Sequence, residues 1–97
     1  MKLRWTQRAL ADLQRLADHI AADHIAAEDR PLAAQAFVAA VADKVARLAL
    51  FPLLGRQGRL DDARELIVHN NHLVSYRLRA DQVQVLQLWR VARERRA

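Results

Sequence analysis

Three runs of branched and aromatic residues, separated by short polar clusters, occupy the second half of the chain. The runs cover residues 64–68, 73–79 and 83–90, and the clusters cover 69–72 and 80–82. Apolar and polar positions alternate within the runs, and the clusters carry the Asn and Asp residues typical of turns. This arrangement predicts a three-stranded antiparallel meander.

Strict alternation divides the side chains of the last two runs between the two faces of the predicted sheet. In the last run it places Leu86 and Leu88 on one face and Val83, Val85, Gln87 and Trp89 on the other. In the run before it, Val74, Tyr76 and Leu78 share a face, and Leu73 lies opposite. One face must pack on the rest of the chain, so the other keeps apolar groups that a monomer leaves partly wet. Such a surface marks a partner site, a homodimer interface or a buried edge equally well.

The first half of the chain begins with a short alternating segment and continues with helical periodicity. Residues 2–6 predict a strand, and Thr6 can act as the N-cap of the helix that follows. The apolar positions of that helix recur at three- and four-residue spacing, whereas Asp12, Arg15 and Asp18 fall on other faces. The apolar set is Leu10, Leu13, Leu16 with Ala17, and Ile20.

A second helix is predicted over residues 32–50. Asp29 and Pro31 suit its start, and the proline of Phe51-Pro52 ends it because proline has no amide hydrogen. One stripe along it contains Phe37, Val41, Val45 and Leu48. Residues 53–63 form the longest irregular segment and hold both glycines, so we expect any special backbone conformation there.

These elements predict an α+β fold in which an N-terminal strand and a two-helix hairpin pack on a three-stranded antiparallel meander. The length of 97 residues suits one domain spanning 1–97. There is no apolar run of membrane-spanning length, no targeting segment is visible at the start, and the chain has no cysteine. We therefore expect a cytoplasmic protein without disulfides.

The net charge of +5 is concentrated at the end of the chain, because residues 77–97 carry six basic and two acidic groups. A basic segment of this kind favours an anionic partner such as nucleic acid or an acidic protein. A solvated tail that only aids solubility is an equal alternative. Only Lys2 and Lys44 of the 16 basic residues are lysines, which favours bidentate contacts, although a GC-rich genome produces the same bias.

Motifs of familiar enzyme chemistry are absent from the sequence. His19 and His24, five positions apart on a helix, do not share a face, and no Asp, Glu or Cys near His69 and His72 completes a ligand set. We therefore expect no metal site and no cofactor. Cleavage of RNA needs a base, a cation and an acid. Arg64, His69 or His72, Tyr76 and Arg77 supply these residue types, with the alternative that Tyr76 is a core residue and the histidines belong to a turn.

Several segments, in this order and at these spacings, resemble the ParE branch of the RelE/ParE superfamily of bacterial type II toxins. They are residues 3–6 with 9–13, the helix end 48–52 with Gly55-Arg56, and the runs 64–68, 73–78 and 83–89. The resemblance covers nearly the whole chain. It implies a helical hairpin on a small, mainly antiparallel sheet, and a cognate antitoxin whose C-terminal segment wraps the toxin in a hetero-oligomer.

The resemblance also implies a target, for which three hypotheses stay open. ParE-like toxins poison DNA gyrase, and charge and terminal position then select Trp89, Arg90, Arg93, Arg95 and Arg96 as contact residues. RelE-like relatives cut mRNA on the ribosome, which would use Arg64, His72, Tyr76 and Arg77. The terminal His-Tyr or His-Phe ending of some such nucleases is absent here, and this favours the non-enzymatic hypothesis. An inert member that only binds its antitoxin is the third.

Overall fold

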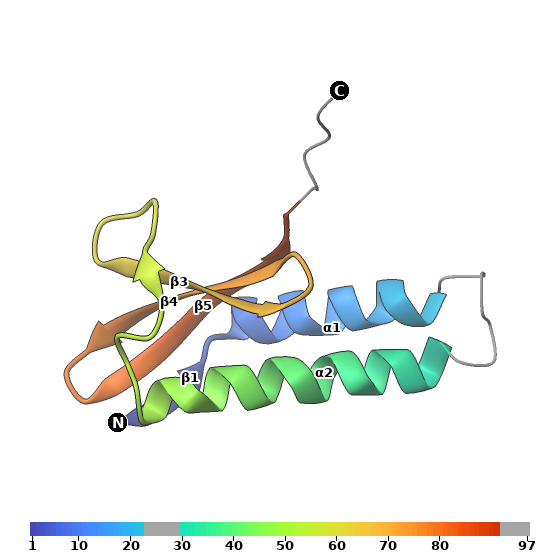
Figure 1. Ribbon diagram of the computed structural model, residues 1–97, viewed down its shortest axis with the longest axis horizontal. Helices are drawn as coiled ribbons and strands as arrows, with labels where there is room; N and C mark the ends of the chain where they lie inside the picture. The colour runs from blue at the N-terminus through green and yellow to red at the C-terminus, as the bar shows by residue number, and fades with distance from the viewer. Residues whose placement is uncertain (23–29, 92–97) are drawn as a thin grey trace.

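Two helices lie side by side against one face of a five-stranded sheet in the computed structural model (Figure 1). The structure describes residues 1–22 and 30–91, and of Arg30 only the backbone. In chain order the elements are β1 (Lys2–Trp5), α1 (Gln7–Ala22), α2 (Arg30–Ala46), the short 3-10 helix η2 (Arg47–Ala49), β2 (Arg56–Gln57), β3 (Ala63–His69), β4 (His72–Arg79) and β5 (Gln82–Arg90). Neither described helix is both long and apolar enough to cross a membrane.

The sheet has the strand order β1-β5-β4-β3-β2. The strands β3, β4 and β5 form the predicted antiparallel meander, and the α+β class is confirmed. The N-terminal strand joins the sheet as the parallel neighbour of β5, with Leu3 opposite Val83. The two-residue strand β2, in which Arg56 lies opposite Glu65, was not predicted because two residues are too few to show alternation.

The unusual backbone conformations fall on residues other than glycine. Asp62, Asn71 and Ala80 have positive φ angles of 61°, 56° and 53°, whereas neither glycine does. The expectation that special conformations fall in residues 53–63 is therefore met by Asp62, whereas Asn71 and Ala80 lie in the turns of the meander. Gly55 is needed for space instead, because a Cβ there would lie 2.7 Å from Cε1 of Tyr76.

The hydrophobic core lies between the helices and the sheet. The predicted stripe of α2 is confirmed, since Phe37, Val41, Val45 and Leu48 are at most 1% exposed. The predicted stripe of α1 is wrong at one position, because Leu10 is 51% exposed. Ala9 occupies the first core position of α1 in place of Leu10. Leu16 and Ala17 complete the buried face, and the partly buried Leu13 and Ile20 pack against it.

A β-bulge in β5 changes which side chains face the helices. Ser75 pairs with Gln87 and the next residue, Tyr76, pairs with Val85, so Leu86 is an extra residue. Alternation restarts after the bulge, and Leu88 is buried on the same side as Val85. The predicted placement of Leu88 opposite Val85 was wrong for this reason.

Beyond the end of β1, the edge of β5 has no strand neighbour, and the side chains of Thr6 and Asp12 form hydrogen bonds with its backbone instead. Thr6 caps α1 as predicted, accepting a bond from the Ala9 amide at 3.2 Å, and its hydroxyl donates to the Val85 carbonyl at 2.7 Å. Asp12 is 5% exposed and accepts a hydrogen bond from the Leu88 amide at 3.0 Å. The prediction that Asp12 lies away from the core was wrong, because this amide has no strand neighbour and needs an acceptor.

Candidate functional site

Tyr76 and Arg64, two residues of the nuclease hypothesis, hold the loop that follows η2. The Tyr76 hydroxyl donates to the Pro52 carbonyl and accepts from the Gly55 amide, both at 2.8 Å. Arg64 Nη1 donates to the Gly55 carbonyl at 2.6 Å. Burial raises the pKa of Tyr76, which keeps its hydroxyl protonated at neutral pH. Both side chains therefore have structural roles.

The other two residues of that hypothesis lie elsewhere. His72 is four positions before Tyr76 on β4, which separates them by roughly 13 Å along the strand. Arg77 follows Tyr76 and so points to the opposite face of the sheet, where its Nε donates to Gln84 Oε1 at 2.9 Å. The structure does not gather the four side chains into one site.

His72 is a buried histidine packed against an aromatic ring. It is 8% exposed, and its ring centroid lies 4.8 Å from that of Phe37, which also contacts His69 at 5.5 Å. Its Nδ1 lies 2.8 Å from the Asn70 carbonyl oxygen, so Nδ1 carries the hydrogen. Burial, and to a smaller extent the charges of His69 and Arg90, lower the pKa of His72, so the ring is neutral at pH 7.

The target-contact residues predicted on β5 are on opposite faces of the sheet. Trp89 lies opposite Leu73 on the face turned away from the helices, while Arg90 lies opposite His72. Arg93, Arg95 and Arg96 are outside the described residues.

The face of the sheet that neither helix covers, called the open face below, carries an apolar row. The row crosses three strands as Ile67, Leu73 and Trp89, and Ile67 is 60% exposed. The adjacent row, Glu65, Ser75 and Gln87, is polar and lines a shallow hollow of about 320 Å³ together with Trp89 and Leu60. This surface has the apolar centre and polar surround of a protein-binding site.

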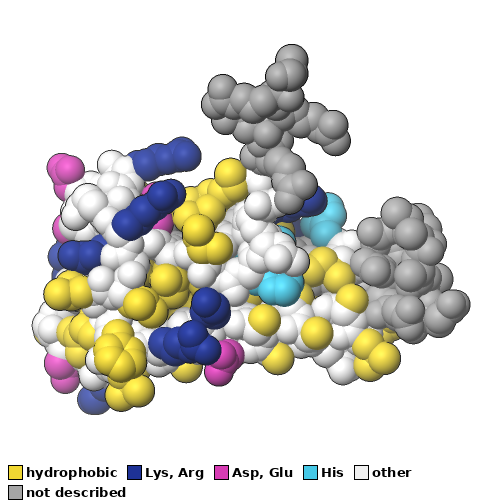
Figure 2. Space-filling view, in the orientation of Figure 1, with side chains coloured by type: hydrophobic (Ala, Val, Ile, Leu, Met, Phe, Trp, Pro, Cys, Tyr) yellow, Lys and Arg dark blue, Asp and Glu magenta, His cyan; other side chains and the backbone are white. Residues whose placement is uncertain are grey.

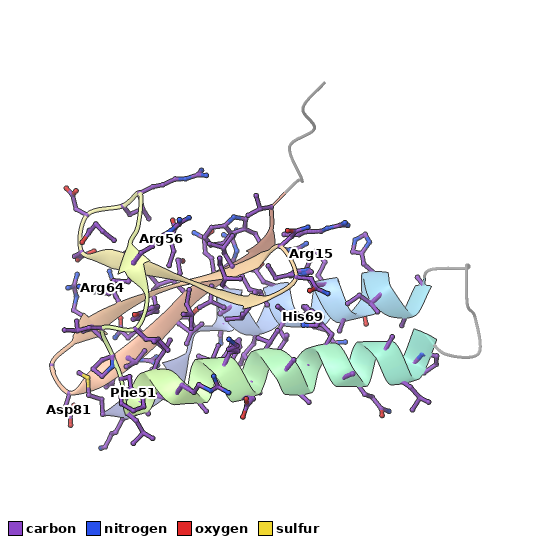
Figure 3. The ribbon with its side chains drawn as sticks, viewed as in Figure 1. Arg15, Phe51, Arg56, Arg64, His69 and Asp81 are labelled. Carbon is purple, nitrogen blue, oxygen red and sulfur yellow. The ribbon has the colours of Figure 1, made fainter. Side chains whose placement is uncertain are left out.

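A second group of exposed apolar side chains lies where α2 ends. Leu50, Phe51, Leu53 and Leu54 are between 49% and 77% exposed. Figure 2 shows hydrophobic side chains gathered at this end of the molecule, and Figure 3 places Phe51 there. The sequence showed these residues only as a helix end and a loop.

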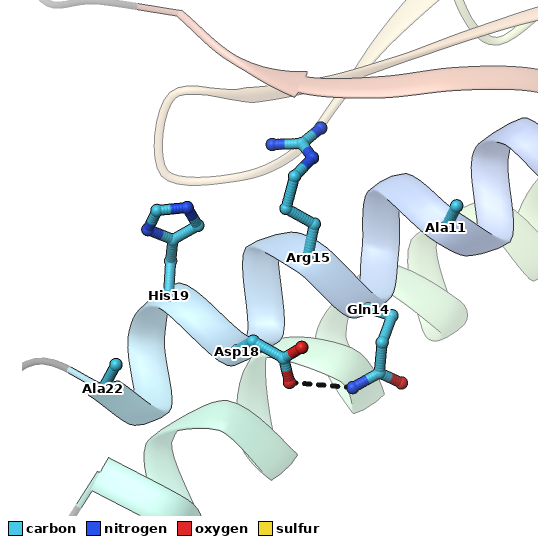
Figure 4. A pocket seen from close by; sticks show the side chains of 6 residues that line it. All are labelled: Ala11, Gln14, Arg15, Asp18, His19 and Ala22. Atoms are coloured by element: carbon cyan, nitrogen blue, oxygen red, sulfur yellow. Dashed lines mark hydrogen bonds between the residues drawn. The ribbon is translucent and has the colours of Figure 1, made fainter.

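A basic pocket of about 610 Å³ lies between α1, α2, the β3–β4 turn and the end of β5, and both helices contribute apolar side chains to its lining. Its ionisable lining residues in the described part of the chain are Arg15, His19, His69, His72 and Arg90. Arg15 and His19, one turn apart on α1, both point toward the β3–β4 turn (Figure 4). Sequence reasoning missed this pocket, because the i, i+4 spacing of Arg15 and His19 was the only local signal. Across residues 1–22 and 30–91, no group of three His, Asp or Glu side chains could hold a metal ion.

Comparison with known proteins identifies the family. The protein-family model described as the ParE toxin of the type II toxin–antitoxin system, parDE, matches residues 3–97 of this chain. A curated protein of Sinorhizobium fredii (strain NBRC 101917 / NGR234), described as "Putative toxin Y4kP", is 35% identical over 81 residues, which cover 82% of this chain and 78% of that protein. A structure described as the chromosomal ParDE TA system from P. aeruginosa superposes with a TM-score of 0.81 at 25% identity, covering 95% of this chain and 97% of the other. The chain belongs to the ParE toxin family of type II toxin–antitoxin systems.

Proposed function

We propose that this ParE-family toxin acts without catalysis, by binding and inhibiting DNA gyrase. The observation that carries the proposal is that Arg64 and Tyr76 hold the loop at Gly55 while His72 and Arg77 lie elsewhere, which favours a binding protein over a nuclease. The charge of the last 21 residues adds to it, since gyrase works on an anionic polymer. Trp89, Arg90, Arg93, Arg95 and Arg96 are the proposed contacts.

The proposal is tested with purified toxin in two parallel reactions, DNA supercoiling by gyrase and translation of a defined message on ribosomes. Loss of supercoiling with accumulation of cleaved DNA is expected, together with intact message. Message cut at ribosome-bound codons would refute the proposal and establish the nuclease alternative. If folded toxin is inactive in both reactions, the result would favour the third hypothesis, an inert family member that only binds its antitoxin.

The proposed contacts are tested by replacing Arg90, Arg93, Arg95 and Arg96 with alanine. The variant should lose toxicity and still bind antitoxin. Its matched control removes arginines outside the basic end, Arg47 and Arg59, which are both exposed. Equal toxicity of the quadruple variant and the control would remove these residues from the contact surface.

We further propose that a cognate antitoxin covers the apolar row of the open face, forming a toxin–antitoxin hetero-oligomer. A wrapping segment would remove apolar area of the exposed Ile67 and the half-buried Trp89 from water, whereas Leu73 between them is only 7% exposed. Replacing the exposed Ile67 with glutamate should weaken antitoxin binding while toxicity remains, since Ile67 contributes little to the core. An Ile67→Glu variant that the antitoxin neutralises as well as the wild type would contradict this placement.

A further inference from the structure

The basic pocket brings together cationic and titratable groups from three segments that are far apart in the sequence. Arg15 and His19 come from α1, His69 and His72 flank the β3–β4 turn, and Arg90 ends β5. No carboxylate lines the pocket within the described part of the chain. Its two arginines, Arg15 and Arg90, carry the fixed positive charge, and Arg15 also pairs with Asp12 outside the lining. A concave surface lined by cations and without a carboxylate of its own favours anions.

The pocket's groups are held in place and retain donors for a ligand. Arg15 Nη2 donates to the buried Asp12 carboxylate at 3.2 Å, which anchors its side chain while 54% of it remains exposed. A guanidinium has five N–H donors, so this one bond leaves most of them available. Arg90 is exposed and lies opposite His72 in the sheet. Figure 3 shows Arg15 and His69 at the same end of the sheet.

The histidines favour an anion over a metal cation. Burial lowers the pKa of His72, and the charges of His69 and Arg90 add a smaller effect in the same direction. A bound anion opposes both effects, since it favours the protonated imidazole. A metal cation would meet the same repulsion from Arg15 and Arg90.

The arrangement of the donors distinguishes between classes of anion. Arg15 and His19 come from α1, whereas His69, His72 and Arg90 come from the sheet, and Asn70 and Asn71 line the pocket at the turn between β3 and β4. A carboxylate presents two oxygens in a plane and suits a single guanidinium fork. A phosphate presents oxygens in a tetrahedron and accepts bonds from several directions.

We propose that this pocket binds a phosphate group carried by a nucleotide or a nucleic-acid strand. Arg15 and Arg90 are its charged clamps, and the rings of His69 and His72 are hydrogen-bond partners beside them. This binding site is separate from the open face. It shares Arg90 with the proposed gyrase contacts, but binding of phosphate is measured without gyrase and does not depend on gyrase being the target.

The test is an NMR titration of the full chain in a phosphate-free buffer, followed through the histidine ring signals. The probes are inorganic phosphate, a short oligonucleotide with a terminal phosphate, and the same oligonucleotide with a terminal hydroxyl. Saturable shifts of the His69 and His72 rings and a rise in the pKa of His72 are expected. Binding of the phosphorylated oligonucleotide alone identifies a terminal monoester as the ligand, and binding of both identifies the backbone diester.

Substitutions of the two pocket arginines test whether the basic pocket is the phosphate-binding site. Arg15→Gln and Arg90→Gln should each weaken binding about tenfold or more, as loss of a charge-assisted hydrogen bond implies. Arg79→Gln is the matched control, since Arg79 is also exposed but pairs with Asp62 in another part of the sheet. Thermal unfolding of each variant checks that the fold is retained.

Three results would overturn the proposal. They are an absence of saturable shifts with all three probes, equal weakening by Arg79→Gln and Arg90→Gln, and displacement of the phosphorylated oligonucleotide by a glutamate-rich peptide at equal concentration. The last result would mean that the pocket takes carboxylates from an acidic protein instead of phosphate.

Discussion

Replacement of Asp12 with alanine should destabilise the fold far more than an ordinary change on the surface of a helix. The substitution removes the acceptor of the Leu88 amide, a bond of 3.0 Å at a residue that is 1% exposed. Leaving a buried donor unpaired costs about 1–3 kcal/mol. Arg8 and Arg15, whose side chains are 66% and 54% exposed, lose their ion pairs with Asp12, at about 0–1 kcal/mol each after solvent screening.

These contributions suggest a total loss of about 3 kcal/mol in the free energy of unfolding. A domain of this length has an unfolding entropy of about 0.2 kcal/mol/K near its midpoint, so the midpoint should fall by about 15 °C. Thermal unfolding followed by far-UV circular dichroism measures this directly. Urea unfolding at constant temperature gives the free energy independently.

Two further variants separate the hydrogen bond from the charge. Asp12→Asn keeps an oxygen for the Leu88 amide and loses only the ion pairs, so it should cost about 1 kcal/mol. Asp18→Ala removes an exposed carboxylate of the same helix that only bonds Gln14, and should change stability by less than about 0.5 kcal/mol. An Asp12→Ala midpoint close to that of Asp18→Ala, or an Asp12→Asn midpoint as low as that of Asp12→Ala, would refute the reasoning.

Three other predictions concern the loop after η2 and the buried histidine. Tyr76→Phe should lower the free energy of unfolding by about 2 kcal/mol, because the Gly55 amide and Pro52 carbonyl lose their partner, and an unchanged urea midpoint would contradict this. Gly55→Ala should cost about 1–3 kcal/mol by overpacking against Tyr76, and clearly more than Gly58→Ala, whose nearest contact would be 3.1 Å. Burial lowers the pKa of His72 below 6.5 in the folded chain, so the unfolded chain binds a proton more readily. The stability that neutral His72 provides is therefore lost as pH falls from about 6.5 through the folded-state pKa. The stability advantage of wild type over His72→Gln should therefore shrink between about pH 7.5 and pH 5 in urea unfolding, and a constant difference would exclude this linkage.

The elements that the sequence predicted well are those set by local chemistry. The stripe of α2 and the cap at Thr6 each depend on residues within a few positions of one another, whereas the predicted helix over 32–50 ends earlier, since α2 stops at Ala46 and η2 follows it to Ala49. The meander was predictable for the same reason, since its turns and alternating runs are local patterns. A chain of 97 residues with these signals leaves few ways to build its core.

The features that were missed depend on contacts between distant segments. The burial of Asp12 is caused by an amide that is 76 residues away, at a place where β1 has ended. The bulge at Leu86 is a property of the pairing between β4 and β5, and it reverses the face of Leu88 without any local signal. The basic pocket takes its ionisable groups from three distant segments, and only the folded chain shows that Arg15 and Arg90 line the same site.

The residues that stabilise this fold and the exposed residues that could contact a partner are different ones, and mutational data on the two sets need different interpretations. Tyr76 and Arg64 match an RNA-cleaving residue set by type, yet their hydrogen bonds end on the backbone of the loop at Pro52 and Gly55. A Tyr76→Phe variant that loses toxicity in cells would therefore reflect a smaller folded population, unless its unfolding midpoint equals that of the wild type. Ile67 and Arg90 are exposed and contribute little to the core, so loss of function there at unchanged stability would report on binding. Measuring stability and toxicity on the same variants thus distinguishes a catalytic tyrosine from a structural one.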